Sequence, residues 1–138
     1  MKGTVNKERT SLTSNHKLLL VCLFALGIIG TTYYYFDTRK EVYQVQWLAG
    51  SISWYSMISF SIIKVLGKKK TGYLVAGILS WTTFAFLMLD NWYTVFHGTV
   101  IATRPDYVMT VRNFIGAGIA ALGILSSHNA FNKMKNKI

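Results

Sequence analysis

Residues 45–89 read VQWLAGSISWYSMISFSIIKVLGKKKTGYLVAGILSWTTFAFLML, and this stretch decides the fold. Two apolar runs, residues 45–66 and 71–89, lie on either side of Gly67 and three consecutive lysines, and Lys64 is the single charged residue inside them. About 20 helical residues cross the roughly 30 Å hydrocarbon core of a bilayer, where charges are costly. The pattern therefore predicts two transmembrane helices, and the short turn between them makes them antiparallel neighbours.

The rest of the 138-residue chain contains two more runs that can cross a bilayer. Residues 18–36 carry no charge. The uncharged run 114–125 gives only about 18 Å of helix at 1.5 Å per residue, so the fourth span must begin near Tyr107 and include Arg112. We expect an all-α fold, an integral membrane four-helix bundle with short loops. Its helices are predicted near residues 18–36, 45–66, 71–96 and 107–127.

Lysine and arginine are unequally distributed between the two predicted sides of the membrane. One side has eleven: Lys2, Lys7, Arg9, Lys17, Lys64, Lys68, Lys69, Lys70, Lys133, Lys135 and Lys137. The other side has three: Arg39, Lys40 and Arg104. The positive-inside rule then predicts a multi-pass protein of the cell (inner) membrane with both termini in the cytoplasm. We expect anionic lipid headgroups to contact Lys64, Lys68, Lys69 and Lys70.

The two ends of the chain are polar and basic. We expect residues 1–16 to form a flexible cytoplasmic tail, residues 17–128 the helical bundle, and residues 129–138 a second basic tail. The first apolar run is longer than the apolar part of a usual signal peptide. It also ends in tyrosines instead of a small-residue cleavage site, so we interpret it as a retained membrane anchor.

The chain lacks the residue sets that common catalytic and metal sites require. Cys22 is the single cysteine, and no HExxH, GxSxG, P-loop or paired-carboxylate pattern occurs. His16 and His128 are predicted at the inner surface and His97 at the outer one; a metal or haem between the first two is the alternative to plain interfacial histidines. We expect no enzyme activity, no metal and no cofactor. Nucleic-acid binding is not expected either, because the basic residues are split among short segments without interleaved aromatic residues.

Small residues recur at helical spacing on the predicted spans, and such faces let helices approach closely in lipid. On the fourth span this face consists of Gly116, Ala120, Gly123 and Ser127. On the second span Ala49, Ser53 and Ser56 share a side. Two interpretations are open: the faces hold one chain's bundle together, or at least one of them, in the first place that of the fourth span, joins separate chains.

Asp90 and Arg112 are the charged residues closest to the predicted hydrocarbon on the outer side. Because the third and fourth spans are antiparallel neighbours, the two residues are predicted at nearly the same depth. We expect an ion pair between them, supported by Asn91 or Asn113, which lowers the cost of Arg112 in lipid. The alternatives are that Arg112 reaches the outer headgroups while Asp90 is solvated, or that the two form a functional ion or proton site.

One short stretch is similar to a known family. Trp81-Thr82-Thr83-Phe84 resembles a Thr-Thr-Phe stretch in the third helix of small four-helix fluoride channels, whose size and span count are also similar. The likeness covers only these residues, and the strong charge bias differs from the dual insertion that those channels often use. Phage holins resemble the chain as a class, being small, helical and basic at the C-terminus.

Four functions remain open at the level of sequence. The first is a non-catalytic subunit or assembly partner in a membrane complex, which acts through small-residue helix faces. The second is a self-assembling pore or channel, holin-like, lined by the serines of the second span. A small-solute carrier is third and a membrane enzyme last, because no catalytic set and no relay of carboxylates is present.

Overall fold

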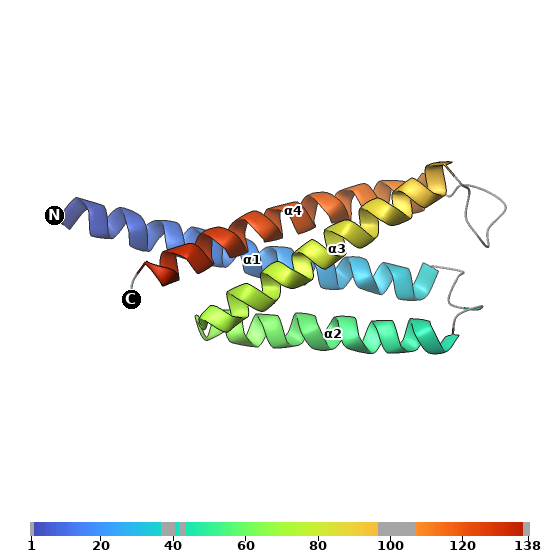
Figure 1. The fold of residues 1–138 in the computed structure, drawn as a ribbon, viewed down its shortest axis with the longest axis horizontal. Helices are drawn as coiled ribbons and strands as arrows, with labels where there is room; N and C mark the ends of the chain where they lie inside the picture. Colours follow the sequence, from blue (N-terminus) through green and yellow to red (C-terminus); the bar gives the residue numbers. More distant parts are fainter. Residues whose placement is uncertain (1, 37–40, 42–43, 97–106, 137–138) are drawn as a thin grey trace.

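The computed structural model describes the backbone of residues 2–36, 41, 44–96 and 107–136, and the side chains of residues 14–35, 41, 44–92 and 111–136. The helices are α1 (Lys2–Phe36), α2 (Gln44–Leu66), α3 (Lys70–Phe96) and α4 (Tyr107–Lys135), as Figure 1 shows. Each contains a segment long and apolar enough to cross a membrane: Ser14–Tyr35, Gln44–Leu66, Lys70–Trp92 and Val111–Lys135. The prediction of an all-helical chain with four spans is therefore confirmed.

Two helices extend beyond the spans predicted from the sequence. The backbone of α1 is already helical at Lys2, although residues 1–16 were expected to form a flexible tail. The backbone of α4 continues to Lys135, through most of the expected tail 129–138. The difference has a simple cause. An uncharged run marks the part of a helix that can lie in hydrocarbon, whereas the end of a helix depends on local backbone preferences that the run does not report.

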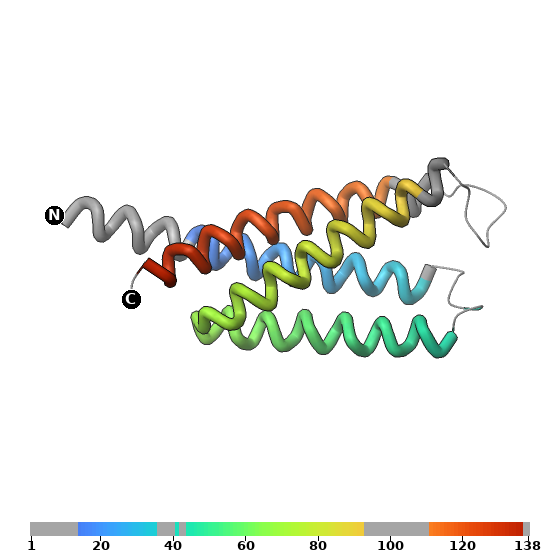
Figure 2. Tube along the Cα trace, in the orientation of Figure 1, coloured from blue at the N-terminus to red at the C-terminus, as the bar shows by residue number. Residues whose placement is uncertain are grey.

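The helices form a ring in which each one packs against the next: α1 on α2, α2 on α3, α3 on α4 and α4 on α1. The pair α3–α4 has the most extensive contact, and α2 contributes to the two weakest of these pairs. Figures 1 and 2 show why: α2 and α3 are joined at one end of the molecule and diverge toward the other, while α3 converges on α4. The ring is thus tight near the α2–α3 turn and open at its far end.

Apolar side chains fill the half of the bundle near the α2–α3 turn. On α1, Leu19, Leu23 and Leu26 are buried at a spacing of three to four residues, which puts them on one side of a helix. The other helices contribute Ile58, Val65, Tyr73, Ala76, Leu79, Ala120 and Ala130 to the same cluster. This core fixes the ring at the end that carries the three consecutive lysines.

Small residues bring α3 and α4 close together along most of their length. A Cβ added at Gly77 would lie 3.0 Å from Ser127 Oγ, and one added at Gly123 would lie 2.6 Å from Ser80 Oγ. Further along, a Cβ at Gly116 would lie 2.7 Å from Leu87. A glycine on one helix therefore meets a side chain of the other at successive levels, which is the close packing that membrane helices rely on.

The turn between α2 and α3 is closed by the backbone. Lys68 N donates a hydrogen bond to Val65 O at 2.9 Å, and Lys69 N donates one to Lys64 O at 3.0 Å. Lys68 has a φ of 52°, in the left-handed region that glycine adopts more easily. A Cβ added at Gly72 would lie 2.6 Å from the Lys64 carbonyl carbon and 2.7 Å from Val65 N. The start of α3 can approach the end of α2 this closely only because residue 72 is glycine.

We therefore expect Gly72→Ala to destabilise the protein, because the new methyl group would press on backbone atoms, which cannot rotate away. Overpacking of this kind costs about 1–3 kcal/mol, more than the roughly 1 kcal/mol that alanine gains over glycine in a helix. The measurement is thermal unfolding in detergent micelles, followed by helical circular dichroism. Gly118→Ala is the matched control, since no atom lies within 4 Å of a Cβ at Gly118. A midpoint for Gly72→Ala at or above that of Gly118→Ala would contradict the close approach.

Candidate functional site

The small-residue face of α4 lies inside the bundle. Ala120 is fully buried and Ser127 is 2% exposed, and Gly116 and Gly123 lie against Leu87 and Ser80 of α3. This face therefore holds α3 and α1 against α4 within a single chain. It leaves no free surface through which the same residues reach a second chain.

The corresponding face of α2 lies on the outside. Ala49, Ser53 and Ser56 are all exposed. Only 17% of the α2 span is buried, compared with 39% for each of the α3 and α4 spans. In the part of the chain that the structure describes, α2 is thus the helix with the largest share of its surface facing away from the bundle.

A polar cluster joins three helices at the open end of the ring. Asn113 Nδ2 on α4 donates a 2.8 Å hydrogen bond to Asp90 Oδ2 on α3. Arg112 Nη1 donates a 3.3 Å hydrogen bond to Thr32 Oγ1 on α1, and its guanidinium lies 3.6 Å from the centre of the Tyr33 ring. Two adjacent residues of α4 thus bind two different helices: Asn113 binds α3 and Arg112 binds α1. The contacts with α1 give Arg112 a hydrogen-bond acceptor and a cation–π contact.

Asn113, the neighbour of Arg112 on α4, is the amide that binds Asp90. The direct ion pair between Asp90 and Arg112 stays a prediction. Asn91 is 4% exposed, and its side-chain amide has no hydrogen-bond partner among the described residues. Asn91 is thus buried near the cluster without taking the supporting role considered for it.

The lysines predicted to contact lipid headgroups lie around the α2–α3 turn. Lys64 Nζ lies 5.3 Å from the centre of the Phe60 ring, and Lys70 Nζ lies 4.9 Å from that of Phe131 on α4. Lys68 and Lys69 are exposed. Two of the four ammonium groups therefore rest on aromatic rings, and the other two point into the surroundings.

Two of the three histidines make hydrogen bonds to side chains of the chain, one between helices and one within a helix. A 2.8 Å hydrogen bond joins His16 Nδ1 to the Tyr73 hydroxyl, and a 2.9 Å bond joins His128 Nε2 to Asn132 Nδ2. His97 lies outside the described residues. Among the residues that are described, no group of three or more histidine, cysteine, aspartate or glutamate side chains is arranged to hold a metal ion.

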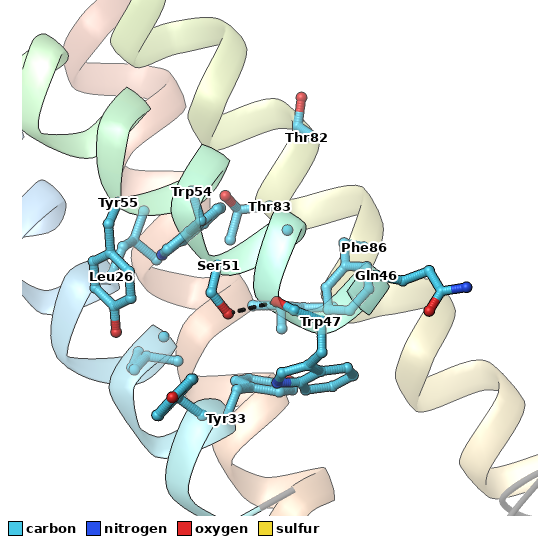
Figure 3. A pocket seen from close by; sticks show the side chains of 15 residues that line it. Leu26, Tyr33, Gln46, Trp47, Ser51, Trp54, Tyr55, Thr82, Thr83 and Phe86 are labelled. Carbon is cyan, nitrogen blue, oxygen red and sulfur yellow. Dashed lines mark hydrogen bonds between the residues drawn. The ribbon is translucent and has the colours of Figure 1, made fainter. Parts of the chain in front are cut away.

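A cavity of about 460 Å³ opens between α1, α2 and α3, on the side where α2 diverges from α3. Figure 3 shows its walls: Leu26, Tyr33, Trp47, Trp54, Tyr55 and Phe86. Its size falls within the roughly 300–1,000 Å³ typical of ligand pockets. The sequence analysis missed this cavity. Aromatic residues at 33–35, 47, 54 and 55 were the available signal, but a one-dimensional pattern cannot show that α2 diverges from α3.

No family model matches the chain, and neither a curated protein nor a solved structure matches it. The two threonines of the stretch that resembles fluoride channels bind their own helix: Thr82 Oγ1 donates to Ile78 O at 2.9 Å, and Thr83 Oγ1 to Leu79 O at 2.6 Å. The fold and the four apolar helices define the class: the chain is a multi-pass α-helical membrane protein.

The predicted Asp90–Arg112 pair is tested by reversing both charges. Either single change, Asp90→Arg or Arg112→Asp, puts like charges together and should destabilise the protein by about 1–3 kcal/mol, less than for a fully buried pair because both residues are half-buried. The double change should recover a clear part of that loss, measured by unfolding in micelles. Arg112→Lys serves as a control that keeps the charge but loses the planar contact with Tyr33. If the double variant is no more stable to unfolding than the less stable of the two single variants, the pair does not exist.

Proposed function

We propose that this protein is a non-catalytic subunit of a membrane assembly and that it binds its neighbours through the outward face of α2. The observation that carries the proposal is the contrast between the two small-residue faces. The face of α4 is buried within the chain, whereas Ala49, Ser53 and Ser56 of α2 are exposed. A face of small residues facing lipid lets a second helix approach closely.

The serines of α2 add a second reason. Ser51 Oγ donates to its own helix, to Trp47 O at 2.8 Å. Ser53, Ser56 and Ser59 are exposed, and their hydroxyl groups make no hydrogen bond within the described part of the chain. A hydroxyl that faces hydrocarbon gains from a partner, and hydrogen bonds between membrane helices contribute about 0.6 kcal/mol on average. A neighbouring helix would supply those partners.

The weak attachment of α2 points the same way. It contacts α1 and α3 less extensively than α4 contacts either of them. Because helix association in lipid depends on packing contacts, a helix with few contacts inside its own chain has the most to gain from contacts outside it. An assembly through α2 would therefore also secure α2 in its own bundle.

A self-assembling pore is the second candidate, and the exposed serines favour it. They lie on the outside of a single chain, so they line a water path only when several chains place α2 around a common axis. This candidate thus requires the same interface and adds conduction to it. Leakage of dye from liposomes that contain the purified chain would support a pore. Liposomes that stay tight at high protein loading would exclude conduction, and only the assembly proposal would remain.

The small-solute carrier stays a prediction without a specific observation in its favour.

The α2 interface is tested by photocrosslinking in the native membrane. A photoreactive phenylalanine analogue at Ser56 should give a discrete adduct, at twice the mass of the chain if the neighbour is a second copy. The same analogue at Gly118, exposed on α4 at a similar depth, is the control and should give little adduct. Equal yields at the two positions would contradict an interface on α2, as would a chain that extracts into mild detergent only as a lone monomer.

We further propose that the end with the α2–α3 turn faces the cytoplasm. The charge bias along the sequence supports this orientation, and Lys68 and Lys69 are exposed at the turn, where anionic headgroups can bind them. The termini would then lie on the cytoplasmic side of the cell (inner) membrane, because the chain has an even number of spans.

Single cysteines test the orientation, since Cys22→Ser leaves a chain without thiols. In that background Lys68→Cys should react with a membrane-impermeant maleimide only after the cells are opened. Glu41→Cys, in the connection between α1 and α2, should react in intact cells. The reverse pattern of labelling would show the opposite orientation.

A further inference from the structure

The cavity between α1, α2 and α3 is separate from the assembly face and shares Tyr33 with the polar cluster. It lies on the inward side of α2, whereas Ala49, Ser53 and Ser56 are on the outward side. Along α1 its lining runs from Leu26 to Tyr34, about 12 Å of helix at 1.5 Å per residue. Half of the hydrocarbon core measures about 15 Å, so the cavity is comparable in depth to one leaflet.

The lining is unsuited to water. Most polar side chains in it are bound within the protein: Ser51 to Trp47 O, Thr83 to Leu79 O, and Tyr55 to Thr31 through a 2.8 Å hydrogen bond. A buried water needs two to four polar partners, whereas the buried Trp54 Nε1 in this lining, which has no partner, is a single donor. The lining therefore favours an apolar occupant.

The shape and the side chains favour a flexible chain over a helix. Membrane helices approach each other across small residues, but six bulky aromatic side chains stand among the residues that line this cavity. Trp54 is wedged against α1, since a Cβ at Gly30 would lie 2.6 Å from its Nε1. A rigid helix about 10 Å wide would have to displace such rings, whereas a hydrocarbon chain can follow the space between them.

The two ends of the cavity differ in polarity. Leu26 and Trp54 lie toward the middle of the spans, while Tyr34, Gln46 and Trp47 lie near the ends of α1 and α2. In Figure 3 the Gln46 amide points away from the aromatic side chains. Tyrosine and tryptophan at a helix end lie at the level of lipid headgroups. An occupant with an apolar tail and a polar head fits this gradient, with its tail pointing toward the bilayer centre.

We infer that this cavity binds one hydrocarbon chain of a membrane phospholipid, whose headgroup lies at the end where α2 begins. The inference is independent of the proposed assembly through the outward face of α2. A bound lipid chain would fill the wedge between α2 and α3 and support α2 where its contacts with the bundle are few.

Gly50 offers a test, because it lines the cavity and no protein atom lies within 4 Å of a Cβ added there. Gly50→Leu should fill the cavity without displacing the chain's own atoms, and Gly50→Ala should fill it less. Gly118→Leu is the matched control: Gly118 is also an exposed helical glycine with open space around it, and it lies on α4, away from the cavity.

The experiment is native mass spectrometry of the full chain released from nanodiscs of phosphatidylcholine. The parent chain and Gly118→Leu should retain one phosphatidylcholine each. Gly50→Leu should reduce retention by about tenfold, equivalent to about 1.4 kcal/mol, and Gly50→Ala should have an intermediate effect. Thermal unfolding and crosslinking from Ser56 are measured on the same variants to show that the bundle and the α2 interface remain.

Equal retention by the parent, Gly50→Leu and Gly118→Leu would overturn the inference, because the lipid would then bind elsewhere. A parent chain that carries no lipid would overturn it too. A parent released as a dimer without lipid, and converted to a monomer by Gly50→Leu, would show that a second copy occupies the cavity instead.

Discussion

The structure depends on the exclusion of charged and unpaired polar groups from hydrocarbon. Backbone groups in lipid must be paired within the segment, so each span is a helix, and polar side chains must find partners or lie at an interface. The polar residues of the described spans largely obey this rule in two ways. Ser51, Thr82, Thr83, Ser126 and Ser127 bind carbonyls of their own helices, while Asp90 and Arg112 bind groups on neighbouring helices. Among the described residues the departures include the Asn91 amide and the Ser61 and Ser80 hydroxyls, which are buried without a partner, and the exposed serines of α2.

The same constraint explains how much of the fold could be predicted from the sequence. Uncharged runs and the lysine cluster at 68–70 predicted four spans and the α2–α3 hairpin, because both follow from the cost of charge in lipid. The helical extensions at 2–16 and 128–135 were not predicted, since they lie where that cost no longer acts. Small-residue spacing identified the faces of α2 and α4 but could not say which partner each face meets. That choice depends on the angles between helices, which the structure shows.

The residues of the polar cluster could be predicted from the sequence, but most of the contacts that they make could not. Asp90, Arg112 and Asn113 were singled out because charged and amide groups are rare in these runs. The contact of Arg112 with Tyr33 and Thr32 was not predicted, because α1 and α4 are far apart in the sequence and only the closed ring brings them together. The cavity was not predicted for a related reason. It arises because α2 diverges from α3, and the angle between two helices cannot be inferred from any single residue.

Tyr33 belongs to both the polar cluster and the cavity. One face of its ring carries the Arg112 guanidinium, and the ring also lines the cavity and contacts Phe86, with 6.3 Å between ring centres. The Arg112 guanidinium therefore helps to orient the Tyr33 ring, which is part of the cavity wall, although Arg112 itself does not line the cavity. The charged group on α4 and the apolar space beside α2 thus meet at a single aromatic side chain of α1, so a displacement of the Arg112 guanidinium would shift one wall of the cavity even with α2 and α3 in place.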